Sequence, residues 1–396
     1  MTVAGKLGGP EAAIGREAAE RSAANRTFFE SEAERLARCC HRMAERFAAG
    51  GRLVALGATP ADRSAARHVA VEFAHPVIVG KRALPALALT LEGGPLAPQL
   101  DALLEPGDFV IGFGGGTATA LGTARERGCL TIGFAPGAAE WDFPPPDAGP
   151  AVRQELVETL YHVLWELVHV FFEHRGLLEG RDEGPRHDAG ASSFLYPFLA
   201  EGETDLDSVL DDVRRSVLMK AEEIGELRER SLTENARALS RAAAEVRDRL
   251  DAGGKLLALG NGGSATDAMD LVADLRAIGR RAMDLTEDTS IITAVANDVG
   301  VRQVFQRQVI AYGHEGDVAL AFSTSGGSAN VIEALAEARR RGLATVAMVG
   351  YGGGQVAAEG LADHVLVVPS QHIPRIQEAQ ASLYHVLCDL IGEAPR

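Results

Sequence analysis

The sequence is poor in aromatic residues, cysteines and basic residues, and each shortage excludes a class of protein. Phe, Trp and Tyr make up 5% of the 396 residues, so a core must be built mainly from Ala, Val, Leu and Ile. Four cysteines, of which Cys39 and Cys40 are adjacent, provide no disulfide framework. This favours a reducing, cytoplasmic location, and because no charged segment followed by an apolar run opens the sequence, we expect no signal peptide.

Basic residues are outnumbered, with 39 Lys and Arg against 55 Asp and Glu and a formal charge of -16. This excess of negative charge argues against nucleic acid or an anionic membrane as the main partner. A small phosphorylated substrate stays compatible, because one pocket can be rich in donors within an acidic protein. The most apolar stretch, 156–172, contains Glu158, His162, Glu166 and His169, so it predicts a buried helix and not a membrane span.

The second half of the chain repeats the first half. Four segment pairs match in the same order: 49–57 with 252–260, 107–113 with 316–322, 127–134 with 341–348, and 154–164 with 377–387. Four matches in register predict two copies of one domain. The length agrees, because 396 residues exceed what one ordinary core supports.

Each copy predicts an α/β fold. A helix (30–48; 232–250) precedes short apolar strands that alternate with helices, which is typical of a parallel sheet covered on both faces. We therefore expect two doubly wound, flavodoxin-like three-layer sandwiches. The expected boundaries are an N-terminal extension at 1–25, a first domain at 26–175, a linker at 176–205 and a second domain at 206–396.

Two loops in the second copy have the composition of a phosphate cradle. The strand at 256–259 runs into Gly260, Asn261, Gly262, Gly263 and Ser264, and a helix is expected from Thr266 or Asp267. A second strand, 319–322, runs into Ser323-Thr-Ser-Gly-Gly-Ser328 before another helix. Glycines allow a close approach to a ligand, and helix starts offer free N–H groups to an anion. The alternative is a pair of tight turns without a ligand. Neither loop is a P-loop or a dinucleotide fingerprint.

The motifs 260–264, 296–298 with Phe305, 323–330 and 372–378 resemble those of the phosphoheptose isomerase family, whose domain is the sugar-isomerase (SIS) domain. The resemblance covers about residues 215–393 and identifies the chain as a tandem double-SIS protein. It implies that the phosphate is held by Ser264, Ser323, Thr324, Ser325 and Ser328. It also implies that Asn261, Gly262, Gly263, Asp298 and Gln377 contact the rest of the substrate.

The same family carries a His-x-x-x-Glu pair after the glycine loop and a Gln and a His eight residues apart on the last helix, which together bind zinc. In the second copy Gln377 and His385 match, but Asp270 and Asp274 stand where the family has His and Glu. These two aspartates could hold a cation or form a solvated helix face. The first copy has all four positions, namely His68, Glu72, Gln154 and His162. The resemblance thus implies Zn²⁺ bound by His68, Glu72, Gln154, His162, Gln377 and His385, with Glu72, His162, His385 and Asp274 as acid–base candidates.

The two copies have lost complementary motifs. In the first copy, 57–61 replaces the glycine loop and 114–119 replaces the serine-rich loop. Residues eight apart on a straight helix lie roughly 12 Å apart along its axis, too far for one zinc with ligands at about 2.0–2.2 Å. We therefore hypothesise a composite site, with the phosphate held by the second copy and metal or acid–base groups partly supplied by the first.

The resemblance implies an aldose–ketose isomerase that converts sedoheptulose 7-phosphate to D-glycero-D-manno-heptose 7-phosphate through an enediol, with help from a metal. The main alternative is a regulatory or scaffold SIS protein that binds a sugar phosphate without turnover. Another SIS enzyme, such as an aminosugar isomerase or a sugar-ether lyase, is the third reading. Because the relatives are tetramers of single domains, the resemblance also implies a homodimer that assembles four SIS domains.

Overall fold

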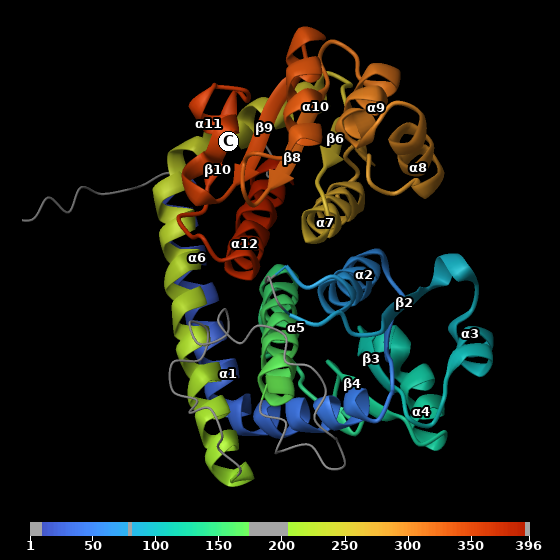
Figure 1. The fold of residues 1–396 in the computed structure, drawn as a ribbon. Coiled ribbons are helices and arrows are strands. Elements are labelled where there is room, and N and C mark those ends of the chain that lie inside the picture. The colour runs from blue at the N-terminus through green and yellow to red at the C-terminus, as the bar shows by residue number, and fades with distance from the viewer. Residues whose placement is uncertain (1–9, 78–80, 174–204, 393–396) are drawn as a thin grey trace, which may run out of the picture. The chain divides into compact units, whose positions relative to one another are not determined.

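The computed structural model describes residues 10–77, 81–173 and 205–392. The chain divides into two compact units: a first unit of residues 24–223 and a second unit of residues 1–23 with 224–396 (Figure 1). The boundaries of both units fall inside two long helices, α1 (Pro10–Ala48) and α6 (Leu206–Asp251). The linker expected at 176–205 lies outside the described residues, apart from Asp205.

Both long helices exceed the lengths expected from the sequence. The expected helix at 30–48 begins at Pro10, so residues 10–25 of the expected extension belong to α1. The expected helix at 232–250 begins at Leu206. Polar side chains of α1 reach backbone carbonyls of α6 at this level: Ser22 Oγ donates to Gly225 O at 2.9 Å, and Asn25 Nδ2 donates to Ala221 O at 2.6 Å. The sequence gives no clear stop signal at the expected ends of α1 and α6. Contacts between residues that are far apart in the chain therefore allow both helices to continue.

The first unit contains one parallel five-stranded sheet with the order β2-β1-β3-β4-β5. Its strands are β1 (Leu53–Gly57), β2 (Ala86–Thr90), β3 (Phe109–Phe113), β4 (Leu130–Gly133) and β5 (Trp141–Asp142). Its helices, besides its parts of α1 and α6, are α2 (Pro60–Ala74), α3 (Leu96–Leu103), α4 (Ala118–Glu126) and α5 (Pro150–Glu173). Successive strand residues point to opposite faces, so Leu53 and Ala55 pack with α1, α2 and α5 while Val54 and Leu56 pack with α3 and α4.

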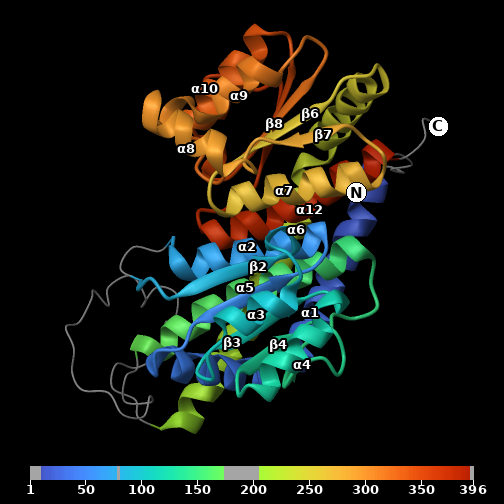
Figure 2. The same ribbon diagram turned by 90° about the vertical axis from the view of Figure 1, so that its right-hand side faces the viewer.

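The second unit has the same topology, with the strand order β10-β9-β8-β6-β7. Its strands are β6 (Leu256–Leu259), β7 (Ala282–Asp284), β8 (Val318–Ser323), β9 (Ala344–Val349) and β10 (His364–Val367). Its helices are α7 (Gly263–Ala277), α8 (Thr289–Asp298), α9 (Val304–Tyr312), α10 (Ala329–Arg340), α11 (Gly354–Ala358) and α12 (Ile373–Gly392). Figure 2 shows α7 and α12 along one face of this sheet and α9 and α10 on the other.

Both sheets confirm the predicted α/β class with parallel strands covered by helices. Counted from the first strand of each copy, both orders read 2-1-3-4-5, the flavodoxin-like arrangement. Within α5, the residues of 156–172 are buried except for half-buried Val157 and Phe172, which confirms that this stretch forms a buried helix. Among the described residues, no helix combines the length and the apolar character needed to cross a membrane.

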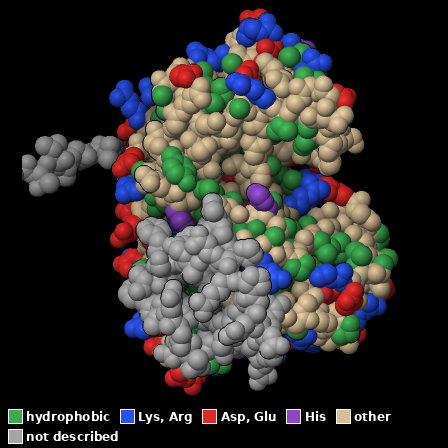
Figure 3. Space-filling model, in the orientation of Figure 1, with side chains coloured by type: hydrophobic (Ala, Val, Ile, Leu, Met, Phe, Trp, Pro, Cys, Tyr) green, Lys and Arg blue, Asp and Glu red, His purple; other side chains and the backbone are tan. Residues whose placement is uncertain are grey.

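The face drawn in Figure 3 shows acidic and basic side chains scattered over the described surface and not gathered into one basic patch.

Candidate functional site

The two loops predicted to bind phosphate lie at neighbouring strand ends in the second unit. Strands β6 and β8 pair directly, from Leu256 opposite Val318 onward. The chain leaves β6 toward β7 on one side and returns to β8 on the other side. Ligands of doubly wound sheets bind at this switch point, beyond the carboxyl ends of the strands. The glycine loop follows β6 and the serine loop follows β8, so both lie at this switch point.

The glycine loop leaves a helix start without a side-chain cap. A Cβ on Gly260 would lie 2.2 Å from the carbonyl oxygen of Ser264, so only glycine fits there. Gly262 has a φ of 57°, and α7 begins at Gly263, earlier than the expected Thr266. Ser264 is buried at 4% exposure in the first turn. The Ser264 and Ala265 N–H groups donate to Asn261 O and Gly262 O at 3.0 and 2.9 Å, so the helix start offers its positive dipole end and the Ser264 hydroxyl to an anion.

The serine loop is folded by its own hydroxyls. Ser323 Oγ lies 3.3 Å from Ser328 Oγ and accepts the Gly326 N–H at 3.2 Å. The Gly327 N–H donates to Ser325 Oγ at 3.2 Å. Thr324 is half-buried and Ser325 is exposed. The loop thus gathers the predicted hydroxyls into one cradle just before α10.

Two further features hold these loops, and the sequence analysis did not identify either of them. Asn261 and Asn330 exchange amide hydrogen bonds at 3.0 and 2.8 Å, which ties the glycine loop to the first turn of α10. Glycines after β9 support the serine loop from behind: a Cβ on Gly354 would lie 2.2 Å from Ser325 O, and one on Gly326 would lie 2.3 Å from Gly353 O. The pairing of Asn261 with Asn330 had a weak sequence signal, because each follows a loop of small residues.

Other predicted residues of the second unit lie apart from this cradle. Asp298 is exposed at the end of α8, where its Oδ1 accepts from the Asn297 side chain at 2.7 Å. Gln377 is buried at 2% exposure on α12, and its Oε1 has no hydrogen-bond partner among the described residues. A buried amide oxygen of this kind is a ready acceptor for a ligand hydroxyl. The structure shows no hydrogen bond from Asp298 to either loop within the described part of the chain.

Helices α7 and α12 bring together the acidic pair and the last histidine. His385 Nε2 lies 3.6 Å from Asp274 Oδ2. The hydroxyl of Tyr384 donates to Asp270 Oδ2 at 2.8 Å. Burial raises the pKa of Asp274, although His385 nearby works in the opposite direction. Asp274 and His385 thus lie next to each other, while Asp270 is engaged by a tyrosine and is not part of a solvated face.

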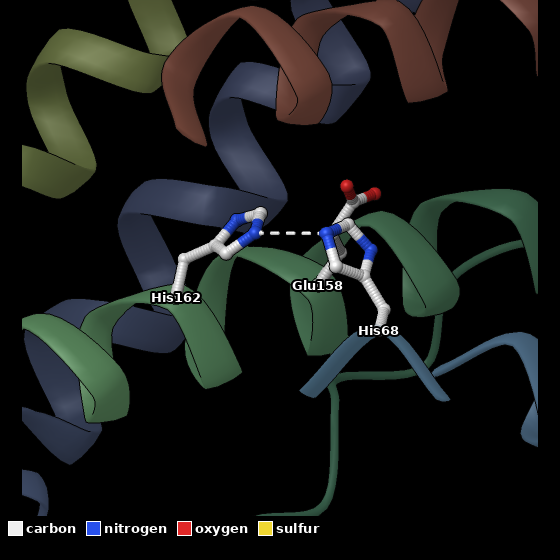
Figure 4. A group of neighbouring side chains, drawn as sticks. All are labelled: His68, Glu158 and His162. Atoms are coloured by element: carbon white, nitrogen blue, oxygen red, sulfur yellow. Dashed lines mark hydrogen bonds between the residues drawn. The ribbon is translucent and has the colours of Figure 1, made fainter. Parts of the chain in front are cut away.

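The first unit contains the clearest candidate metal site, on α2 and α5. His68 Nε2 lies 3.4 Å from His162 Nε2, and His68, His162 and Glu158 each offer a ligand atom within 4.8 Å of the other two (Figure 4). Two ligands at about 2.0–2.2 Å from a tetrahedral ion lie roughly 3.3–3.6 Å apart, which fits the histidine pair. Tyr161 O–H and His68 Nδ1 are 2.7 Å apart, so the tyrosine holds the ring with Nε2 facing His162.

Glu158 was not among the ligands expected from the sequence. Helix geometry favours it: Glu158 precedes His162 by four residues, roughly 6 Å along the axis, while Gln154 precedes it by eight. A glutamate one turn before a histidine, inside an otherwise apolar helix, was the available signal. The corresponding position in the second copy is Ala381, so that copy lacks this carboxylate.

Burial sets the protonation of the histidine site. The pKa of His68 lies well below its ordinary value because of burial and the neighbouring His162, so His68 is neutral and can donate a lone pair. Glu72 Oε1 lies 3.8 Å from His68 Nε2, and burial raises the pKa of Glu72 to about 7. A carboxyl group with that pKa can accept and return a proton near neutral pH.

A hollow of about 660 Å³ lies at the opposite edge of the second sheet, where β6 and β8 begin. Both signs of charge line it, and the pair Lys255 Nζ and Asp317 Oδ2, 2.6 Å apart, belongs to its wall. Ligands of parallel α/β sheets bind at the carboxyl edge of the strands. This hollow lies at the other edge of the sheet from the loops that follow β6 and β8.

A parallel sheet of this order, with glycine and serine loops at its switch point, defines a doubly wound α/β domain. Comparison with known families agrees, because residues 221–350 match the SIS domain. The C-terminal domain of glucosamine-fructose-6-phosphate aminotransferase from Francisella tularensis superposes with a TM-score of 0.62 over 96% of this chain and 95% of that chain. At 10% identity this likeness concerns the fold alone, and it extends across both units.

Sequence relatives identify the family. The phosphoheptose isomerase of Nitratidesulfovibrio vulgaris is 44% identical over 186 residues, which are 46% of this chain and 88% of that protein. The phosphoheptose isomerase of Rhodospirillum rubrum is 45% identical over 165 residues, 40% of this chain and 87% of that protein. The chain belongs to the phosphoheptose isomerase family, as its motifs predicted, and is an aldose–ketose isomerase.

Proposed function

We propose that this chain interconverts sedoheptulose 7-phosphate and D-glycero-D-manno-heptose 7-phosphate. The observation that supports this most directly is the pair of glycine and serine loops at the ends of β6 and β8, in a family whose members are named phosphoheptose isomerases. In this proposal, the hydroxyls of Ser264, Ser323 and Ser328 and the positive dipole end of α7 bind the phosphate. Binding the unreactive end of the sugar fixes the position of C1 and C2.

The reaction moves one proton between adjacent carbons. A base removes a proton from C1 of the ketose while an acid protonates the C2 carbonyl oxygen, giving an enediol; the O1 proton then leaves and C2 receives a proton. Asp274 with His385, and Glu72 with His162, are the acid–base candidates. The raised pKa of each carboxyl group, caused by burial, suits a group that must both accept and release a proton.

We propose zinc as the cofactor, held by His68, Glu158 and His162, with Glu72 beside them. The fit rests on the 3.4 Å separation of the histidine nitrogens and on the tyrosine that orients His68. When bound, such an ion would stabilise negative charge on an oxygen of the substrate. Gln154, Gln377 and His385 remain predicted metal residues by resemblance, and metal analysis of their variants tests them.

Product analysis tests the function. The purified protein is incubated with sedoheptulose 7-phosphate, with added zinc or with a chelator, and the aldoheptose phosphate is followed by NMR. Metal-dependent formation of the aldose is the expected result. Binding without turnover would instead favour the regulatory role, which the replacement of His and Glu by Asp270 and Asp274 would then explain. Absence of binding would point to a different sugar phosphate.

We also propose a homodimer, by analogy with the expected assembly of four SIS domains. The chain mass is 41.8 kDa. Size-exclusion chromatography with light scattering should report twice this mass. A mass equal to one chain would contradict the proposal.

A further inference from the structure

The first unit has an aspartate where the second unit has a phosphate-binding serine. A Cβ on Gly57, at the end of β1, would lie 2.4 Å from the carbonyl oxygen of Asp62. A Cβ on Gly260, at the end of β6, would lie 2.2 Å from the carbonyl oxygen of Ser264. The same close approach in both copies makes Asp62 the structural counterpart of Ser264. The first loop is one residue longer, which hides this correspondence in an ungapped comparison.

Asp62 closes the helix start that is left open in the second unit. The Thr59 N–H donates to Asp62 Oδ2 at 3.1 Å, and the Asp62 N–H donates to Thr59 Oγ1 at 3.2 Å. Pro60, between them, has no N–H to offer. This capping box uses the donors that an external anion would need. Helix α7 has no side-chain cap. Its Ser264 and Ala265 N–H groups donate to the backbone carbonyls of Asn261 and Gly262 at 3.0 and 2.9 Å, so its start carries no charged cap of the kind that Asp62 provides.

The carboxylate also fills the space of a second phosphate-binding serine. Residue 108 corresponds to 317 in the repeat, so Gly114 occupies the position of Ser323. A Cβ on Gly114 would lie 2.4 Å from Asp62 Oδ2 and 2.5 Å from Oδ1. The loss of the serine side chain makes room for the longer aspartate, and a carboxylate at this point repels a phosphate.

We infer that Asp62 is a built-in anion that closes the first unit to phosphate, so that each chain binds one phosphosugar, in the second unit. The inference rests on the proposed function for the identity of the ligand but not for its position. Asp62 thereby determines the number of substrate sites. The two units share a fold and differ in whether the anion at the switch point comes from the chain or from the ligand.

Calorimetric titration with a hexitol phosphate, which has no carbonyl and cannot react, measures the number of sites. We expect one per chain, and loss of binding in a Ser264→Ala/Ser328→Ala variant. Two sites per chain, or one site of unchanged affinity in that variant, would overturn the inference. A turnover assay on the wild type separates this from the proposed function, because binding stoichiometry does not depend on catalysis.

A site-resolved test uses crystals of the wild type and of Asp62→Ser grown at high phosphate concentration. We expect an anion at the Ser264 loop in both, and one at the 59–62 loop only in Asp62→Ser. The variant Asp62→Asn, which keeps the size of the side chain but removes its charge, should show a weaker anion at the same place. Phosphate at 59–62 in the wild type, or at that loop in neither variant, would refute the role of Asp62.

Discussion

The two units have the same sheet order and register, yet their helices after the first strand begin differently, with a capping box on α2 and no side-chain cap on α7. An aspartate holds the start of the central strands in both: Asp108 Oδ1 accepts the Arg52 N–H at 2.9 Å, and Asp317 Oδ1 accepts the Lys255 N–H at 2.9 Å. The differences lie at the opposite, carboxyl edge. There the second unit has open loops and the first has a capping box. The core and the edge where the strands start therefore maintain the fold. The loops at the carboxyl edge can differ between the units without changing it.

The helix pair packed on each sheet differs in the opposite sense, because here the first unit has the candidate ligands. In the first unit a tyrosine holds a histidine, and in the second the corresponding tyrosine holds Asp270. Only the first unit, among the described residues, assembles two histidines and a glutamate around one point. One copy thus keeps the anion cradle and the other keeps the metal-type ligands, and four substitution experiments sharpen this contrast.

The largest effect is expected from the phosphate cradle. Ser264→Ala/Ser328→Ala removes two hydroxyls that would donate to a charged group, each contributing about 1.5–3 kcal/mol. We expect kcat/KM to fall by about 10²- to 10⁴-fold, measured with sedoheptulose 7-phosphate. The matched control is Thr59→Ala/Thr119→Ala, which removes hydroxyls from the corresponding loops of the first unit. An equal loss of kcat/KM in the control variant would show that the loops of the two units do not differ in their contribution to activity.

The acid–base candidates come next. Glu72→Gln keeps the shape of the side chain and removes its ability to take a proton, so we expect kcat to fall by about 10²-fold with KM nearly unchanged. Asp274→Asn should have a smaller effect, because the Asp274 side chain is 31% exposed while that of Glu72 is 2% exposed. Full activity together with full metal content in His68→Ala and Glu72→Ala would show that the first unit contributes nothing to catalysis.

The metal site gives a more moderate effect. Glu158→Ala removes a proposed ligand, and we expect the affinity for zinc to fall by at least about 10- to 100-fold. Gln154→Ala should leave it unchanged, because that side chain lies two turns from His162. Competition with a chromophoric chelator measures the affinity without an activity assay. A loss of zinc affinity in Gln154→Ala but not in Glu158→Ala would support the ligand set implied by the family resemblance.

The smallest contrast concerns the aspartates that anchor the strands. Burial alone would raise the pKa values of Asp108 and Asp317, but hydrogen bonds from Arg52 and Lys255 lower both below the ordinary 3.8. A depressed pKa stabilises the fold above the ordinary value, and this stabilisation is lost as the pH falls through the lowered value. Asp108→Asn and Asp317→Asn should each lower the free energy of unfolding by about 1–3 kcal/mol at neutral pH, and by less below about pH 4.

Chemical denaturation of both variants at the two pH values measures these costs. Similar losses would support the same structural role in both units. A loss that stays constant with pH would show that the effect comes from packing and not from charge.

The sequence by itself determined the duplicated α/β fold, because apolar strands alternate with helices and four segments recur in register. It also located the glycine and serine loops at strand ends, although it left open whether they bind a phosphate or form tight turns without a ligand. The tertiary structure decided which residues meet across elements: Asn261 with Asn330, Glu158 with the two histidines, and Asp62 with Gly114. These contacts depend on how helices pack on a sheet. In addition, the loop before Asp62 has one extra residue, so an alignment without a gap does not place Asp62 opposite Ser264.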